Sequence, residues 1–271
     1  MSAPPAHFLE CDFHTHTELS GEEQARGFTL ERLFETAEGL GLRHVGCSEH
    51  WHAGTPPELF RRMREEIERL QPRFRVKVHL SAEIDVLNSN GDMAADPALA
   101  AGMLDYVSSA VSHYGAPGAE QLRPDIVDDT VAMIEALCRT PEVTMIMHPQ
   151  IVYGRCVEKI DGVVGPDVYD AAMKAVAAAG KVIDFPSVDL SLDYLRILGF
   201  EADKLSHAAE SFRNFARALV RRKCLLAPGS DAHNVLWGDG VTPWLGNSGA
   251  SWELLTSAGF DEGRLWYFEN R

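Results

Sequence analysis

The sequence has no apolar run that approaches the roughly 18 residues needed for a membrane-spanning helix. Its first five residues, Met-Ser-Ala-Pro-Pro, provide neither the basic nor the apolar segment of a secretory signal. The five cysteines form no Cys-x-x-Cys pair, and an odd, scattered set is typical of reduced thiols. We therefore expect a cytoplasmic protein without disulfide bonds and without a membrane partner.

The sequence also has few basic side chains relative to acidic ones. Lys and Arg number 25 against 40 Asp and Glu, which gives a formal net charge of −15. Such a surface repels phosphate backbones and anionic lipid, so a dedicated nucleic-acid binder is not expected. A small anionic substrate is still compatible with this charge, because bound divalent cations can reverse the field inside one cleft.

The signature motifs of three common enzyme classes are missing as well. The sequence contains no Gly-x-x-x-x-Gly-Lys-Ser/Thr loop, no Gly-x-Gly-x-x-Gly and no Gly-x-Ser-x-Gly. Nucleotide kinases, dinucleotide-binding folds and α/β-hydrolases therefore lack support from the sequence.

The chain does show short β-type runs that alternate with amphipathic helical stripes over 30–40, 59–70, 126–138, 168–179 and 205–220. This alternation has no composition break, so it predicts one α/β domain over residues 1–271. The domain would be a parallel barrel of seven or eight strands, or a doubly wound open sheet. We place its core at 8–233 and a C-terminal extension at 234–271, with a final outer helix after Gly246. The runs are Phe8–Phe13, His44–Ser48, Arg75–Ala82, Tyr106–Val111, Val143–Met147, Lys181–Phe185 and Lys223–Ala227.

Every predicted strand end carries a side chain that can bind a metal ion. A parallel barrel has its active site at these carboxyl ends. Residues two apart in an extended segment point the same way, so His14 and His16 can reach one ion together, as can Asp231 and His233. Seven strand ends in register predict a shared metal centre. The side chains are, in chain order, His14, His16, His50, Glu83, His113, His148, Asp184, Asp231 and His233.

The other histidines are expected to have structural roles. His7 and His44 precede strands and should lie at the opposite mouth of the barrel, whereas His79 is inside a strand and His207 is on a helix. His52 lies near the predicted metal centre, but we expect strand alternation to direct it away from the face used by His50.

The motifs at these strand ends, taken together and in this order, resemble the PHP (polymerase and histidinol phosphatase) family. They are His14-x-His16, Ser48-Glu49-His50, Glu83, His113, His148-Pro149 and Gly229-Ser230-Asp231-Ala232-His233, and the resemblance spans residues 12 to 233. It implies a distorted seven-stranded β/α barrel, similar to a TIM barrel, with two or three metal ions. By this resemblance one ion is held by His14, His16, Glu83 and Asp231, a second by Glu83, His113 and His148, and a third by His50 and His233. Histidine-rich sites with mixed nitrogen and oxygen ligands accept zinc, iron and manganese.

Two segments depart from the family pattern. Relatives often complete the third site with a His or Asp shortly after the His-x-His pair, but this chain reads Thr-Glu-Leu-Ser-Gly-Glu-Glu over 17–23. Glu22 is the best substitute, because a carboxylate oxygen can ligate most divalent ions; a solvated loop acid is the alternative. The sixth strand carries Asp184 where relatives often have an Asn-rich segment. Asp184 could hydrogen-bond a ligating histidine or contact substrate.

The expected chemistry is phosphate ester hydrolysis on a small metabolite such as histidinol phosphate, a nucleotide, or a sugar or cyclic phosphate. Clustered ions can bridge a hydroxide and bind two phosphate oxygens. Asp231 or His233 could deliver a proton to the leaving alkoxide, and Arg155, Lys159 and Arg123 are candidates for binding the substrate phosphate. The alternatives are an amidohydrolase-like hydrolase of an amide or lactone, a PHP-type exonuclease, and an inactive metal-binding interaction domain.

Overall fold

The centre of the molecule is one sheet of seven parallel strands that pair in chain order, from β1 to β7. The structure is a computed structural model that describes residues 4–111, 113–121, 125–151, 156–186, 192–197, 199–236, 244–247 and 249–266. The strands are β1 Cys11–Thr15, β2 His44–Trp51, β3 Lys77–Asp85, β4 Val107–Ala110, β5 Val143–Met147, β6 Val182–Pro186 and β7 Leu225–Gly229.

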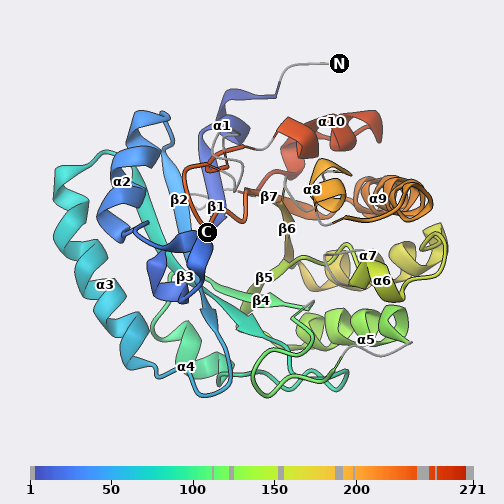
Figure 1. The fold of residues 1–271 in the computed structure, drawn as a ribbon, viewed down its shortest axis with the longest axis horizontal. Helices are drawn as coiled ribbons and strands as arrows, with labels where there is room; N and C mark the ends of the chain where they lie inside the picture. Colours follow the sequence, from blue (N-terminus) through green and yellow to red (C-terminus); the bar gives the residue numbers. More distant parts are fainter. Residues whose placement is uncertain are drawn as a thin grey trace.

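The sheet curves into a nearly closed barrel (Figure 1). Thr15, at the end of β1, forms a parallel bridge with Ala232, just after β7. The amide of His16 donates to the carbonyl of Ala232 at 2.8 Å. A doubly wound sheet would reverse its strand order and leave the first and last strands apart. The predicted seven-stranded α/β barrel, a single TIM-barrel-like domain, is therefore confirmed.

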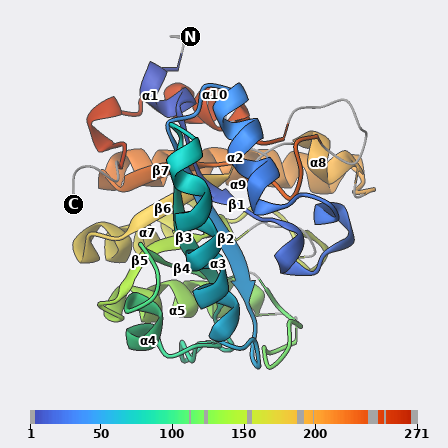
Figure 2. The same ribbon diagram turned by 90° about the vertical axis from the view of Figure 1, so that its left-hand side faces the viewer.

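The helices cover the outside of the barrel (Figures 1 and 2). The apolar stripes predicted from the sequence form the buried faces of α2, α3, α5, α7 and α9. Among the described helices, none combines the length and hydrophobicity needed to cross a bilayer. The helices are α1 Ala6–Leu9, α2 Leu30–Gly39, α3 Glu58–Leu70, α4 Pro97–Ala101, α5 Ile126–Arg139, α6 Cys156–Lys159, α7 Pro166–Ala179, α8 Leu192–Ile197, α9 Ala202–Arg222 and α10 Gly249–Ser257.

The prediction of a first strand over Phe8–Phe13 was wrong at its start. Residues Ala6–Leu9 form the short helix α1, in which the amide of Phe8 donates to the carbonyl of Pro5 at 3.0 Å. The Phe8 ring packs against Trp252 of α10, with ring centroids 4.9 Å apart. Phe8 therefore buries its ring outside the barrel and does not contribute to β1.

Aromatic rings fill the interior of the barrel. Phe13 contacts Tyr106 and Trp266 at centroid distances of 6.3 and 4.9 Å. The predicted helix after Gly246 is present as α10, but the chain then returns to the sheet, where the amide of Trp266 donates to the carbonyl of Leu226 at 2.7 Å. The C-terminal extension therefore contributes a ring to the barrel core as well as an outer helix.

Gly46 of β2 faces this aromatic core, and replacing it with alanine is expected to destabilise the protein. A methyl group there would overlap the hydroxyl of Tyr106 and the carbonyl of Phe13. Overpacking of a dense interior typically costs about 1–3 kcal/mol, so thermal unfolding of Gly46→Ala should show a lower Tm. Gly39→Ala is the matched control, since a methyl group at Gly39 meets open space. Equal Tm values for the two variants would contradict this account of the core.

Candidate metal centre

The chemistry-bearing side chains converge at the carboxyl ends of the strands, where the sequence placed them. Most are buried, with exposed fractions of 0% for His14, His16 and Glu83. Parallel strands deliver their last residues to one rim of the barrel, so ligands distant in sequence become neighbours. The His-x-His spacing works as expected, since the Nε2 atoms of His14 and His16 lie 3.1 Å apart.

Glu83, at the end of β3, is the centre of this group. The nitrogens of five imidazoles lie 3.1–3.6 Å from its two carboxylate oxygens, and they belong to His14, His16, His50, His113 and His148. Its Oε1 atom faces His113 and His148, and its Oε2 atom faces the other three rings. The carboxylate can therefore bridge two positions.

Asp231 closes one side of the group. Its Oδ1 atom lies 3.2 Å from the Nε2 atoms of both His14 and His16. Asp231 and His148 adopt φ values of 54° and 51°, a conformation that residues other than glycine rarely occupy. Such backbone strain persists only where the surroundings enforce it, and it often accompanies functional sites.

Glu22 reaches the other side of the group from the loop after β1. Its Oε1 atom lies 3.6 Å from Nε2 of His50, and its Oε2 atom lies 2.5 Å from Nδ1 of His233. The structure therefore places Glu22 beside both predicted ligands of the third ion. The sequence analysis gave two alternatives for Glu22, a metal ligand or a solvated loop acid.

A buried carboxylate on the neighbouring strand holds the Glu22 loop in place. Glu49 Oε1 accepts from the amide of Thr17 at 2.7 Å and from its hydroxyl at 2.5 Å. Burial raises the pKa of Glu49 to about 7, although the hydrogen bonds from Thr17 oppose this shift. The Glu49 contacts thus join the end of β2 to the segment that carries Glu22.

Asp184 on β6 orients one of the clustered rings. Its Oδ2 atom lies 2.7 Å from Nδ1 of His14, so Nδ1 donates a proton to Asp184 and Nε2 faces Asp231 and Glu83. The sequence had left two roles open for Asp184, and the structure shows the hydrogen bond to a histidine. Gly229 makes room for this pair, because a methyl group there would overlap the Asp184 carboxylate and crowd His14.

Asp85 has a similar role that the sequence analysis missed. Its Oδ1 atom lies 2.8 Å from Nδ1 of His113, and its Oδ2 atom lies 2.7 Å from Nδ1 of His52. The prediction that His52 turns away from the site was wrong. Its ring stacks on that of His50 with centroids 5.0 Å apart, because residues two apart in an extended segment share a face. The same rule applied to Glu83 and Asp85 could have found Asp85.

Asp12 anchors the loop that carries Asp231 and His233. Its carboxylate accepts from the amide of Ser230 at 2.9 Å, from the Ser230 hydroxyl at 2.6 Å and from the amide of Gly246 at 2.8 Å. Burial raises the pKa of Asp12 to about 6 against the effect of these bonds. No motif in the sequence singled out this residue.

Of the three proposed phosphate-binding residues, only Lys159 lies within the described part of the chain. Arg123 and Arg155 lie outside the described residues. Lys159 ends the short helix α6 with an exposed side chain, and within the described part of the chain we observe no hydrogen bond or ion pair from it to the clustered residues. Their role in binding substrate stays a prediction.

The charges in the cluster are strongly coupled. Burial alone would raise the pKa of Glu83, but the imidazoles of His113, His148 and His50 hold it well below its usual range. Burial lowers the pKa of His16 to about 4, and neighbouring His233 and His50 reinforce this effect. The pKa of His113 rises to about 9 despite burial, because Glu83 and Asp85 stabilise its charged form.

These residues fit a group of divalent metal ions. Both oxygens of Glu83 and both ring nitrogens of His50 are buried and have no hydrogen-bond partner among the described residues. Lone pairs of carboxylates and neutral imidazoles that face each other at 3.1–3.6 Å repel unless a proton or a cation lies between them. Within the described part of the chain, four sets of three side chains bring ligand atoms within 4.8 Å of one another: His16, His50 and His233; His14, His16 and Asp231; His14, Glu83 and His148; and His50, Glu83 and His113.

Several solved structures resemble this chain at low sequence identity. No family model matches this chain, and neither does any curated protein. The histidinol phosphate phosphatase of Lactococcus lactis, solved with zinc, L-histidinol and phosphate, is 13% identical with a TM-score of 0.57, covering 93% of this chain and 94% of that chain. A chain of an archaeal ribonuclease P with mature tRNA is 10% identical, with a TM-score of 0.49 and coverage of 92% and 90%. A Xaa-Pro dipeptidase is 12% identical, with a TM-score of 0.44 and coverage of 92% and 70%. The likeness to the phosphatase shows a shared fold.

Proposed function

We propose that this protein is a metal-dependent phosphoesterase of the PHP type that acts on a small phosphorylated metabolite. The observation that carries this proposal is the buried carboxylate of Glu83, surrounded by five imidazoles at 3.1–3.6 Å. Such a mixture of ligands suits zinc, iron or manganese. The fold shared with a phosphatase solved with zinc and phosphate supports the same activity.

The proposed centre holds up to three ions. The first would be held by His14, His16, Glu83 and Asp231, the second by Glu83, His113 and His148, and the third by Glu22, His50 and His233. When bound, such ions supply a nucleophilic water at neutral pH and offset negative charge on the phosphoryl oxygens.

The chain's own residues orient the ligands and handle the proton. Asp184 and Asp85 fix the rings of His14 and His113 through their Nδ1 atoms. His233 Nε2 lies 3.5 Å from Asp231 Oδ1, and the Asp231 side chain is 10% exposed where its neighbours His14 and Glu83 are fully buried. We assign the delivery of a proton to the leaving alkoxide to His233, beside Asp231. Burial would lower the pKa of His233, but Asp231 and Glu22 raise it. Burial would raise the pKa of Asp231, but His14 holds it well below its usual range, so Asp231 has no proton to give.

Glu22→Gln is expected to weaken the third ion selectively. The substitution keeps the shape of the side chain but removes the charge that faces His50 and His233. Loss of a charge-assisted contact typically costs tenfold or more in affinity, so we expect roughly that decrease for the most weakly held ion. Metal titration followed by elemental analysis measures it.

Glu23→Gln is the matched control for this variant, because the neighbouring Glu23 side chain is exposed. Glu23→Gln should keep the metal affinity of the unaltered protein. Equal metal content and affinity in the two variants would remove Glu22 from the centre and leave it as a loop acid.

Phosphate release from a substrate panel tests the proposed activity. The purified protein is analysed for metals and assayed on phosphomonoesters and phosphodiesters, with and without a chelator. We expect release from at least one phosphomonoester, loss of activity with the chelator, and recovery with added zinc, manganese or iron. Hydrolysis of amides or lactones without any phosphate release would overturn the proposal, and so would degradation of single-stranded DNA alone.

A further inference from the structure

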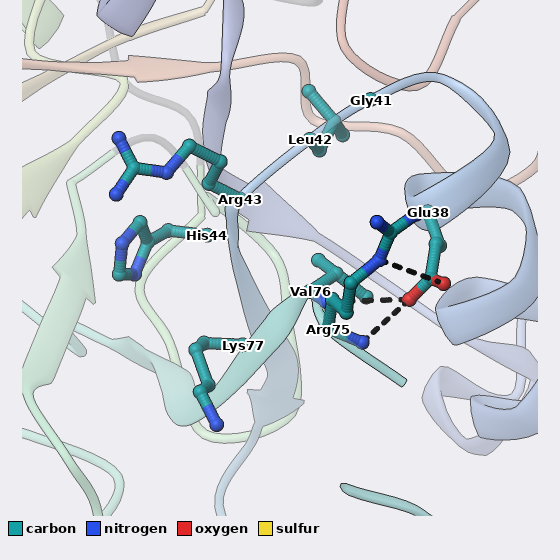
Figure 3. Close-up of a pocket in the computed structure, with 8 residues that line it drawn as sticks. All are labelled: Glu38, Gly41, Leu42, Arg43, His44, Arg75, Val76 and Lys77. Carbon is teal, nitrogen blue, oxygen red and sulfur yellow. Dashed lines mark hydrogen bonds and ion pairs between the residues drawn. The ribbon is translucent and has the colours of Figure 1, made fainter. Parts of the chain in front are cut away.

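A recess lies at the end of the barrel opposite the metal centre, where β2 and β3 begin. It has a volume of about 390 Å³ and is lined by Glu38, Gly41, Leu42, Arg43, His44, Arg75, Val76 and Lys77 (Figure 3). Small-molecule sites commonly measure about 300–1,000 Å³. The recess, which we call the basic pocket, is therefore large enough for a small ligand.

The lining of the basic pocket is positive although the protein is strongly negative. Arg43, Arg75 and Lys77 contribute three cationic groups to the lining, against the carboxylate of Glu38 and that of Glu10, which pairs with Arg43 at 3.4 Å, in a chain whose net charge is −15. Figure 3 shows the side chains of Arg43 and Lys77 leaving the strand ends on the same side as His44. The local field therefore favours an anion.

Glu38, the one acid that lines the basic pocket, already accepts hydrogen bonds from backbone amides. Glu38 Oε2 accepts from the amide of Arg75 at 2.6 Å and from that of Val76 at 3.4 Å. Its Oε1 atom lies 3.7 Å from Nε of Arg75, whose side chain is 93% exposed. Glu38 thus holds the 75–76 backbone in place, and the long ion pair leaves the Arg75 guanidinium able to turn toward a ligand.

One histidine of a stacked pair, His44, lines the basic pocket, and His79 packs against it. His44 Nδ1 lies 2.9 Å from Nε2 of His79, and the two rings stack with centroids 5.3 Å apart. His44 is the register partner of Lys77 on the next strand, so the imidazole and the ammonium are neighbours at the same level. The sequence analysis assigned structural roles to both histidines, with His44 at this mouth of the barrel and His79 inside a strand.

The basic pocket is separate from the metal centre. Six residues of extended chain join His44 to His50, and a strand rises about 3.3 Å per residue, so the two sites lie roughly 20 Å apart. An anion bound at one end of the barrel does not touch the ligands at the other.

We propose that the basic pocket binds a small phosphate-bearing anion, independently of the metal centre. Guanidinium groups match phosphate oxygens through paired N–H donors, and the Lys77 ammonium adds a point charge. Arg43, whose side chain is 62% exposed, adds a second guanidinium to the lining.

Titration with inorganic phosphate and pyrophosphate, followed by NMR of the His44 and His79 imidazole resonances at constant ionic strength, tests this proposal. We expect saturable shifts of these resonances, with affinity lowered about tenfold in Lys77→Glu and in Arg75→Gln, the loss typical of one charge-assisted contact. Lys174→Glu, at an exposed position on α7, makes the same charge change as Lys77→Glu and should leave the affinity unchanged.

The same titration of Glu83→Gln separates this proposal from the proposed phosphoesterase activity. Saturable binding in that variant would support the basic pocket even if no substrate is ever hydrolysed. Shifts that stay linear with concentration, or equal affinity in Lys77→Glu and Lys174→Glu, would overturn it. Arg75→Gln keeps the test valid if Lys77→Glu fails to fold, because its side chain is almost fully exposed.

Discussion

Replacing Glu83 with glutamine is expected to empty most of the proposed metal centre and to lower the proposed phosphoesterase activity by roughly a thousandfold or more. The carboxylate is fully buried, and its two oxygens face five imidazoles at 3.1–3.6 Å. Glutamine has nearly the same shape, but it loses the negative charge and turns an N–H₂ group toward ligand nitrogens. Several kcal/mol of metal-supplied stabilisation of the transition state would be lost, and each 1.4 kcal/mol is tenfold in rate.

Elemental analysis and kcat/KM measure this effect, with circular dichroism to show that the variant is folded. Glu66→Gln serves as a control, because Glu66 pairs with Arg69 on the exposed side of α3 and should keep both metal and activity. A folded Glu83→Gln protein with full metal content and turnover would show that Glu83 does not bridge ions, and the proposed centre would fail.

The positions of the cluster could be predicted because they depend on local rules. Strand ends follow from hydrophobic runs, and parallel strands bring their ends to one rim whatever the loops do. His14 and His16 illustrate this, since the spacing of two fixed their common direction before any tertiary contact was known. The same reasoning located Glu83 and His148 from the ends of β3 and β5.

Contacts between distant segments could not be predicted in this way. The approach of Glu22 to His233 depends on how the loop after β1 closes, and Glu49 and Thr17 control that closure. The anchoring of the Ser230 loop by Asp12 joins residues 218 positions apart. Such pairings arise from the path of the whole chain, and a single sequence carries no periodic signal for them.

Packing near the two ends of the chain could not be predicted from the sequence either. The run from Phe8 had the composition of a strand, but packing against Trp252 made its first part helical. Trp266 entered the barrel interior from a segment that we expected only to cover the outside. In both cases an aromatic ring found a partner far along the chain, and this contact outweighed local propensity.

Removing the metal ions with a chelator is expected to lower Tm by about 10 °C. Ions that bind only the folded state stabilise it by about 4 kcal/mol for each site held at a thousand times its Kd, and each kcal/mol is worth a few degrees for a chain of this size. The chelator should leave the Tm of Glu83→Gln nearly unchanged, because that variant has few ions to lose. Scanning calorimetry measures both proteins.

The stability of the metal-free protein should fall as pH rises from about 6.5 to 9. Glu83 and Asp85 overcome the effect of burial and raise the pKa of His113 to about 9, above the ordinary histidine value of 6.5. Because the pKa of His113 is higher in the folded state, the folded protein binds more protons than the unfolded chain. The stabilisation from His113 is therefore complete below pH 6.5 and is lost as pH passes 9. Urea unfolding across this range, with the chelator present, measures the loss. A metal-free protein whose stability is constant or rises over this interval would contradict the coupling between Glu83 and His113.

Metal binding should reverse the pH dependence of stability, because ions bind only neutral imidazoles and displace the protons that the metal-free cluster carries. The pKa values of His14 and His50 are also raised by nearby carboxylates against the effect of burial, so more than one proton should leave at pH 7. Titration calorimetry with zinc, in buffers of different ionisation enthalpy, counts them. If no protons are released, the imidazoles are already neutral without metal. The prediction that they share protons with the carboxylates 3.1–3.6 Å away would then be wrong. Release of protons together with affinity that increases with pH is the result expected if these side chains are built to exchange protons for metal ions.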